Sequence, residues 1–395
     1  MLDSIYTGMT GLLGFSSGLR TISNNTANMN TPGFKGSTVQ FADLFYSDGN
    51  LNGGHNGGQI GFGLGTRGTS INFKQGELRN SDNDLDLAID GLGMFVVRDS
   101  AGQIHHTRAG QFEFDSTGVL VDKLDRAKVL GLDDGGNFVE ISVAGLRTNS
   151  AQATGSVKFT GNLSSTATIQ NATATVLDAA GAAHSLSLAF TNITGSSSTT
   201  NSTWSLSVTD GSTPVGSGLL TFTNGNLDAT TGRVTFSYAP AGVASKVVIF
   251  DFSSDVTSFA SGNVTNLAMA SRDGHTAGGL VKSTFDADGV LTLTYSNGQK
   301  VQGTSLAVSH FDTIDAVRAI GGSRFDAIDP KAWHIGRANK DIFGSIRGAT
   351  LEASNVDLSS EFSELVIMQR GYQSSSQVIS TANEMLQELF TMRGK

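Results

Sequence analysis

The stretch that decides the fold lies near the C-terminus, where residues 358–389 read LSSEFSELVIMQRGYQSSSQVISTANEMLQEL. Apolar or small residues recur there every three or four positions, which is the period of one helix face. The apolar residues that mark this face are Leu358, Phe362, Leu365, Tyr372, Ile379, Leu386 and Leu389. Asp357 or Ser359 can cap the first turn, and Glu361 suits the positive end of the helix dipole. The pattern predicts a helix of about 32 residues, roughly 48 Å long.

The N-terminal end has the same period. Its apolar face consists of Leu2, Ile5, Met9, Leu12, Leu19 and Ile22, with one double step across Ser16. Gly8, Gly11, Gly14 and Gly18 each destabilise such a helix by up to about 1 kcal/mol relative to alanine, so the helix needs a partner. We predict that the two terminal helices pack against each other and against neighbouring copies, which favours an assembly subunit over an enzyme.

Composition narrows the class of protein further. The chain has 395 residues with 49 Gly and 4 Pro, which favours several domains built from short strands and tight turns. Its net charge of -9 offers no basic surface for nucleic acid. No apolar run is long enough for a membrane span, so we expect no membrane insertion, and the N-terminus lacks the pattern of a cleavable signal peptide. The absence of Cys excludes disulfides and thiolate sites.

Between the ends the pattern is β-like, and charge becomes sparse from 151 to 250. We therefore expect a mainly β chain with α-helical termini, a nested multi-domain subunit whose β-rich body carries an inserted β-sandwich or barrel-like domain. The expected parts are paired terminal helices at 1–30 and 357–395, a connecting region at 31–75 and 330–356, a β-rich core domain at 76–145 and 270–329, and an inserted outer β domain at 146–269. Within the connecting region, the Gly-rich residues 50–68 read as a loop.

Two motifs flank the terminal helices. Residues 23–35 read SNNTANMNTPGFK, in which Pro32 cannot continue a helix and Gly33 permits a turn. Residues 351–362 read LEASNVDLSSEF and contain Asn355, Val356 and Asp357. The first motif supplies Asn24, Asn25, Asn28, Asn30, Gly33 and Phe34 as candidate family positions.

These motifs, with FKQGEL at 73–78, LDLAIDGLGMFVV at 85–97 and TRAGQF at 107–112, resemble the bacterial flagellar rod and hook axial proteins. The C-terminal half is similar to the hook members of that family. The resemblance covers roughly 1–145 and 270–395 and is absent from the insert. Two positions depart from it: Ala349-Thr350 replaces a Gly-Ala step, and Gly371 lies inside the last helix. We expect Gly371 to soften that helix locally.

The resemblance implies a homopolymer, a curved tube that acts as a universal joint and transmits torque from the rod to the filament. It further implies rod proteins, hook–filament junction proteins and a hook cap as partners, and export through the flagellar type III channel to an extracellular position in the hook. No cofactor is implied. In such a tube, the Gly-rich residues 50–68 and the polar insert would be surfaces that slide.

Enzyme chemistry finds little support in the sequence. His105 and His106 are adjacent on an expected strand and so point to opposite faces, and no third ligand lies at metal-binding spacing. The Asp residues at 82, 84, 86 and 90 do not match the EF-hand spacing. We predict no catalytic, cofactor-binding or metal residues. Two alternatives to the hook subunit remain: a distal rod subunit, and a secreted β-rich adhesin or glycan-binding protein.

Overall fold

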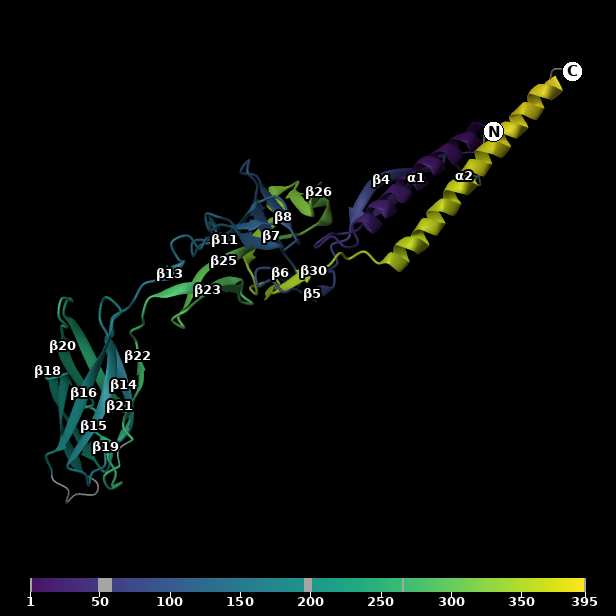
Figure 1. Ribbon diagram of the computed structural model, residues 1–395. Helices are drawn as coiled ribbons and strands as arrows, with labels where there is room; N and C mark the ends of the chain where they lie inside the picture. The colour runs from purple at the N-terminus through teal and green to yellow at the C-terminus, as the bar shows by residue number, and fades with distance from the viewer. Residues whose placement is uncertain (1, 49–58, 195–200, 265, 394–395) are drawn as a thin grey trace. The chain divides into compact units, whose positions relative to one another are not determined.

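The computed structural model describes residues 2–48, 59–194, 201–264 and 266–393 (Figure 1). The chain divides into two compact units. Unit 1 comprises Met1–Ala144, Ser283–Leu293 and Val301–Lys395, and unit 2 comprises Gly145–Lys282 and Thr294–Lys300. Unit 2 is thus inserted in the sequence of unit 1. The predicted fold class, mainly β with the two terminal helices packed together and a barrel-like sheet, is confirmed.

Both terminal helices form where the apolar period predicts them. Helix α1 spans Leu2–Ala27 and helix α2 spans Leu358–Arg393. The cap of α2 is Asp357, whose Oδ1 accepts the backbone N–H of Ser359 at 2.8 Å. After α1 the chain turns at Gly33, which has a φ of +67°. Only glycine adopts this conformation at little cost, so Gly33 permits the turn that leads from α1 toward β1.

A β hairpin follows α1 and packs beside it. Strand β1 (Ser37–Asp43) pairs with β4 (Leu64–Ile71), and β2 (Tyr46–Asp48) pairs with β3 (Gln59–Gly61). The expected loop at 50–68 is therefore wrong at 59–61 and 64–68, which form strands. Its 50–58 portion lies outside the described residues. Strand β4 forms although it contains Gly65 and Gly68. Its first residue, Leu64, packs its side chain against Gly14 of α1, which anchors the strand beside the helix.

The β body of unit 1 is one antiparallel sheet with the order β24-β25-β11-β7-β8-β27-β26, to which β9, β10, β12 and β28 are added. Two short strand pairs, β29–β6 and β30–β5, join the C-terminal connector to the body. The strands are β5 (Leu78–Asn80), β6 (Leu87–Asp90), β7 (Met94–Arg98), β8 (Ile104–Thr107), β9 (Phe112–Phe114), β10 (Leu120–Asp122), β11 (Lys128–Leu132), β12 (Phe138–Glu140), β24 (Val290–Tyr295), β25 (Lys300–Phe311), β26 (Val317–Gly321), β27 (Arg324–Ala327), β28 (Trp333–Arg337), β29 (Ser345–Gly348) and β30 (Thr350–Glu352). Two 3-10 turns, Ile314–Ala316 and Pro330–Ala332, complete the body.

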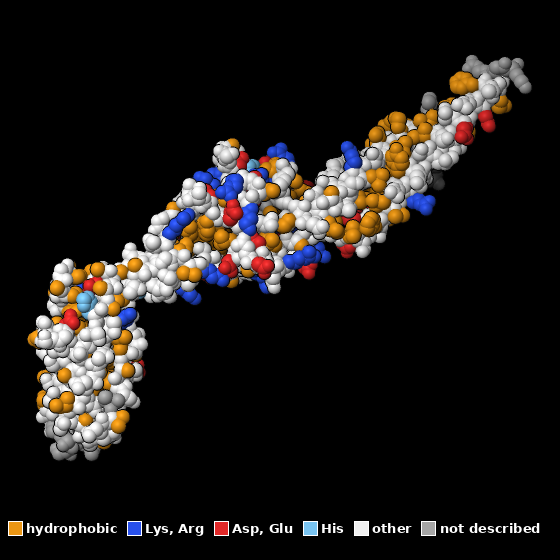
Figure 2. All heavy atoms as spheres, in the orientation of Figure 1, with side chains coloured by type: hydrophobic (Ala, Val, Ile, Leu, Met, Phe, Trp, Pro, Cys, Tyr) orange, Lys and Arg blue, Asp and Glu red, His pale blue; other side chains and the backbone are white. Residues whose placement is uncertain are grey.

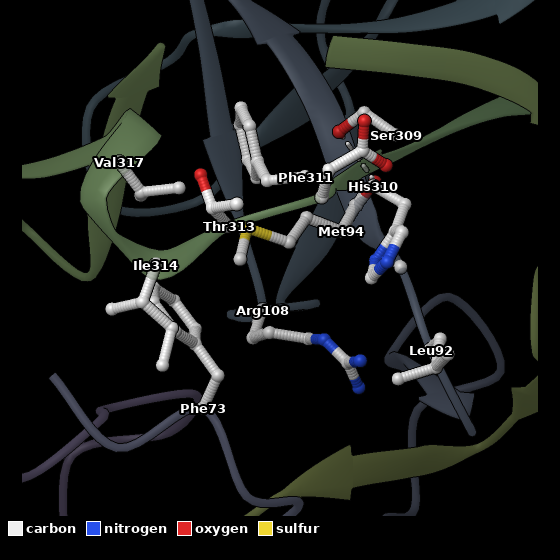
Figure 3. A pocket seen from close by; sticks show the side chains of 12 residues that line it. Phe73, Leu92, Met94, Arg108, Ser309, His310, Phe311, Thr313, Ile314 and Val317 are labelled. Carbon is white, nitrogen blue, oxygen red and sulfur yellow. Dashed lines mark hydrogen bonds between the residues drawn. The ribbon is translucent and has the colours of Figure 1, made fainter. Parts of the chain in front are cut away.

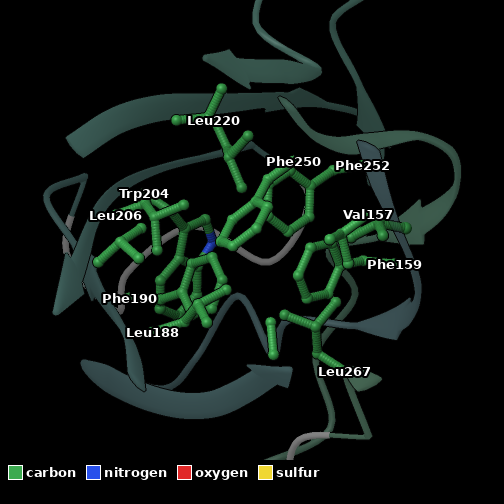
Figure 4. Close-up of a cluster of buried hydrophobic side chains, with 14 of the residues drawn as sticks. Val157, Phe159, Leu188, Phe190, Trp204, Leu206, Leu220, Phe250, Phe252 and Leu267 are labelled. Atoms are coloured by element: carbon green, nitrogen blue, oxygen red, sulfur yellow. The ribbon is translucent and has the colours of Figure 1, made fainter. Parts of the chain in front are cut away.

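Unit 2 contains a nine-stranded sheet with the order β15-β16-β17-β18-β19-β21-β14-β22, with β20 paired to β21. Its strands are β14 (Ser156–Asn162), β15 (Ile169–Leu177), β16 (Ala183–Asn192), β17 (Ser202–Asp210), β18 (Thr213–Thr223), β19 (Asn226–Leu227), β20 (Arg233–Tyr238), β21 (Lys246–Thr257) and β22 (Ala268–Arg272), and a short pair joins β13 (Thr148–Asn149) to β23 (Gly278–Phe285). Alternate residues of each strand point inward around Trp204, Phe190 and Phe250, all 0% exposed (Figure 4). Unit 2 therefore has a hydrophobic core of its own.

Candidate assembly site

The contact between α1 and α2 is built on glycines. A Cβ added to Gly8 would lie 2.8 Å from Cγ1 of Ile379, and one added to Gly18 would lie 2.8 Å from the sulfur of Met368. The reverse arrangement occurs at Gly371 of α2, where a Cβ would lie 2.5 Å from the ring of Phe15. A side chain at these positions would require the facing side chain or the helices to move, so the glycines permit the close approach of the two helices.

The residues predicted for self-assembly are distributed over several faces of the two helices. Ile22 is buried at 3% exposure. Ile5, Leu12, Leu19, Leu365, Ile379 and Leu386 are half-buried, and Met9, Leu358, Phe362, Tyr372 and Leu389 are exposed. The structure thus brings together part of this set, and the closest contacts come from glycines that the apolar pattern did not select. Their spacing, three or four positions apart, was the available signal.

A further apolar face of α2 has no partner among the residues of unit 1 that the structure describes. Ile367 is 62% exposed, Val378 44% and Met385 45%. Because α1 lies against Met368, Ser375 and Ile379, it leaves this neighbouring face uncovered. Figure 2 shows hydrophobic side chains gathered along the terminal helices. Contiguous apolar surface of this kind is typical of sites that bind another protein.

The family motifs meet in a junction between the helices and the β body. Asn25 is 2% exposed and uses its whole amide group: Nδ2 donates to the Ser37 carbonyl at 2.8 Å and to Glu361 Oε1 at 2.9 Å, while Oδ1 accepts from the Ser37 N–H at 3.0 Å. Burial raises the pKa of Glu361, although the bond from Asn25 opposes that shift. One side chain therefore joins the end of α1, the start of β1 and the first turn of α2.

Asn355 makes a similar junction from the C-terminal side. Its Oδ1 accepts the Gly36 N–H at 2.8 Å, and its Nδ2 donates to the carbonyls of Asn72 at 2.7 Å and Lys74 at 2.8 Å. Its neighbour Val356 is half-buried. Asn25 and Asn355 thus join the N- and C-terminal connectors by bonding to their backbone N–H and carbonyl groups. These backbone groups have no partner in a β sheet among the described residues, and the two side chains satisfy them.

The remaining motif residues shape the turn after α1. Asn28 Nδ2 donates to the Asn24 carbonyl at 2.9 Å, and Asn28 Oδ1 accepts from the Thr31 hydroxyl at 3.1 Å. The Gly33 N–H donates to the Glu352 carbonyl at 2.8 Å. Phe34 is half-buried, and Asn30 is exposed.

A buried group of three charges holds the junction. The carboxylate of Glu352 pairs with Lys35 and, at 2.9 Å, with Arg108, and these side chains are 0%, 1% and 6% exposed. Burial lowers the pKa of Lys35, and the charge of Glu352 opposes that shift. Arg108 also donates to the Ile89 carbonyl at 3.1 Å and the Gly91 carbonyl at 2.6 Å. Sequence reasoning did not single out these three residues, although each lies inside a motif that it quoted.

Beside this junction lies a small cavity of about 150 Å³ (Figure 3). Phe73, Met94 and Ile314 form apolar walls, and Arg108 lies at one side. The guanidinium is already bonded to Glu352 and to two carbonyls, so it is poorly placed to bind an anion. Among the described residues no cluster of three His, Cys, Asp or Glu could hold a metal ion. No described helix is long and apolar enough to cross a membrane.

The two adjacent histidines have separate environments. His105 Nδ1 lies 2.6 Å from Asp326 Oδ1, and its Nε2 lies 3.2 Å from Asp99 Oδ2. His106 is 1% exposed, and its Nδ1 lies 2.7 Å from the Ser309 hydroxyl. The rings therefore point to opposite sides of β8 and form no joint site.

Comparison with known proteins connects these features to a family. Three family models match: a flagella basal body rod protein model at 5–35, a flagellar hook protein FlgE/F/G D1 domain model at 88–158, and a flagellar basal body rod FlgEFG protein C-terminal model at 347–392. The first and last of these cover most of α1, part of the Asn25 junction and α2.

Full-length relatives agree with these models. The chain is 26% identical to the flagellar hook protein FlgE of Salmonella typhimurium over 99% of this chain and 100% of that protein. It is 27% identical to FlgE of Escherichia coli, covering 98% of each chain, and 28% identical to FlgE of Rhizobium meliloti, covering 100% of this chain and 99% of the other. The crystal structure of Helicobacter pylori flagellar hook protein FlgE2 matches 70% of this chain with a TM-score of 0.53 at 14% identity, a likeness of fold. This chain belongs to the bacterial flagellar rod and hook proteins, and its full-length relatives are hook proteins.

Proposed function

We propose that this chain polymerises into the tube of the flagellar hook, with the terminal helices forming the contacts between copies. The observation that carries the proposal is the exposed face of α2, where Ile367, Val378 and Met385 remain uncovered after α1 has packed. Burying an aliphatic side chain of this size contributes about 1.5–3 kcal/mol, so several such residues can drive assembly. The junction at Asn25 and Glu352 then transmits load from the helices to the β body.

We infer the finer role from the family resemblance. As a hook subunit, the chain acts without catalysis, reaches the cell exterior by the flagellar export channel, and forms a flexible joint that passes torque from the rod to the filament. Its neighbours are then rod proteins, the hook cap and the hook–filament junction proteins. The full-length matches to hook proteins favour this function over a distal rod subunit and over an adhesin.

Electron microscopy of the purified protein tests the proposal. We expect curved tubes from the full chain and none from a chain that ends before residue 360, because the truncation removes α2. The truncated chain should keep the fluorescence of buried Trp204, since that residue belongs to the core of unit 2. Tubes of normal diameter from the truncated chain would refute a role for α2, and straight tubes from the full chain would indicate a rod subunit.

A further inference from the structure

The β hairpin beside α1 exposes an apolar surface that the described residues of unit 1 do not cover. This hairpin patch consists of Phe41, Leu44, Phe45 and Tyr46, which are 40%, 37%, 59% and 56% exposed. Phe45 stacks on Phe62 with ring centroids 4.6 Å apart, and Phe41 lies 6.1 Å from Phe15 of α1. These contacts hold the patch in one arrangement before any partner binds, which lowers the entropic cost of binding.

Helix α2 exposes the second surface. Its outer stripe consists of Ile367, Val378, Met385 and Met392, spaced by eleven, seven and seven residues and therefore aligned on one side of the helix. Beside it lies a shallow hollow of about 300 Å³ lined by Ser374, Gln377, Val378, Thr381, Ala382 and Met385. Three of the six lining residues, Ser374, Thr381 and Ala382, are small, and the volume is enough for a large side chain from another molecule.

The proposed polymer requires two different surfaces on each copy. If the outer stripe bound a second outer stripe, the contact would be self-complementary and assembly would stop at two copies. If the stripe binds a different patch, every new copy leaves one free surface of each kind, and the chain of copies grows. The hairpin patch and the outer stripe are two such surfaces, both carried by the helical end of unit 1.

We propose that the hairpin patch of one copy docks on the outer stripe of α2 in the next copy. Charges beside the two surfaces are complementary. Asp43 ends β1 next to the patch, and Arg370 lies one helical turn from Ile367. Both are exposed, and neither makes an ion pair among the residues that the structure describes. Facing each other across the contact, these charges fix its register. The inference rests on the proposed function and names the surfaces that perform it.

A mixing experiment tests the contact. The hairpin variant carries Phe45→Ser and Tyr46→Ser, and the stripe variant carries Val378→Ser and Met385→Ser. All four residues are exposed, so both variants should keep the circular dichroism of the wild type. Loss of the Phe45–Phe62 stack should lower the melting temperature of the hairpin variant only slightly. Each variant alone should remain monomeric in analytical ultracentrifugation. An equal mixture should form a one-to-one dimer, since one intact patch and one intact stripe are present.

The outcomes separate this inference from the proposed function. A mixture that stays monomeric while the wild type forms tubes would overturn the inference alone, as would tubes from the hairpin variant. A wild-type chain that forms no oligomer would overturn both.

Charge reversal gives an independent check. Asp43→Arg and Arg370→Asp should each raise the critical concentration for assembly by about fivefold, and the two changes in one chain should restore it. Asp315→Arg is the control, an exposed carboxylate on a 3-10 turn of the β body, and should leave the critical concentration unchanged. Equal effects of Asp43→Arg and Asp315→Arg, or a double variant as poor as either single variant, would contradict the register.

Discussion

Glycines in the terminal helices illustrate how one residue type can have opposite effects. From propensity alone each glycine weakens its helix, and Gly371 suggests local softness. In the folded chain the same residues are where the helices touch: a Cβ on Gly11 would lie 2.6 Å from the Ser375 hydroxyl, and one on Gly371 would enter the ring of Phe15. Packing favours glycine at these positions. The dispersion energy gained when the two helices lie close together exceeds the free energy that glycine loses in helix propensity.

Gly371→Ala measures this balance. Alanine should gain about 1 kcal/mol of helix propensity and lose about 1–3 kcal/mol through the clash with Phe15, so the variant should be less stable or at best neutral. Adding Phe15→Leu removes the opposing ring and should make the double variant more stable than the sum of the two single changes predicts. Urea unfolding followed by circular dichroism gives the four free energies. Strict additivity would mean that Phe15 and position 371 do not interact.

His106 makes stability depend on pH. It is buried against Phe311 and Trp333, its Nε2 has no partner among the described atoms, and burial lowers its pKa from 6.5 to about 4. Between these values the unfolded chain binds more protons than the folded chain. The stability from neutral His106 is therefore complete above pH 6.5 and is lost as the pH falls toward 4.

The expected loss is about 3 kcal/mol, because one pKa unit corresponds to about 1.4 kcal/mol. Urea unfolding at pH 7 and pH 4.5 should show most of this difference in the wild type and little of it in His106→Gln. His334→Gln is the control, since that side chain is 51% exposed. An unchanged pH dependence in His106→Gln would show that other groups cause it.

At the scale of elements, the junction of connectors and β body depends on a few polar side chains that join distant segments. Glu352 ends β30, and it contacts Lys35 after α1, Arg108 after β8 and the Gly76 N–H at 2.9 Å. Four stretches of chain are thus fixed by one carboxylate. A buried ion pair of this kind specifies an arrangement more than it adds stability, since the desolvation of the charges offsets much of their attraction.

Removing the carboxylate should therefore be costly. Glu352→Gln leaves Lys35 and Arg108 buried without a counter-charge and should lower the unfolding free energy of unit 1 by about 3–5 kcal/mol. Glu77→Gln is the matched control: Glu77 pairs with Arg79, but these side chains are 68% and 66% exposed, so the change should cost no more than about 1 kcal/mol. Urea unfolding of both variants measures the difference. Equal losses of unfolding free energy in the two variants would show that burial does not increase the contribution of the Glu352 ion pairs to stability.

Sequence reasoning predicted those elements whose formation depends on local pattern. The three-four period located α1 and α2. It failed at β3 and β4: β4 pairs with β1 and packs against α1, and β3 pairs with β2, and no local pattern reveals these contacts. It also missed Glu352, whose partners lie 317 and 244 residues away. The set of self-assembly residues stays a prediction.

At the scale of the whole molecule, each of the two units has buried hydrophobic clusters of its own. In unit 2 a cluster of buried residues surrounds Trp204, and in unit 1 Phe325 and Met94 belong to a different cluster against which Trp333 packs. Each core lies within its own unit. Residues that share one hydrophobic core unfold together in one cooperative transition. Because the two units have separate cores, we expect each unit to unfold in a transition of its own.

The two Trp residues of the chain, one in each unit, allow this to be measured. In Trp333→Phe, fluorescence reports unit 2 alone, and in Trp204→Phe it reports unit 1 alone. Adding Phe250→Ala, which removes a 0% exposed ring from unit 2, should lower the Trp204 transition by about 3–5 kcal/mol and leave the Trp333 transition where it was. If instead both transitions shift by the same amount, the units unfold as one body. Independence would allow unit 2 to vary in sequence without disturbing the helices.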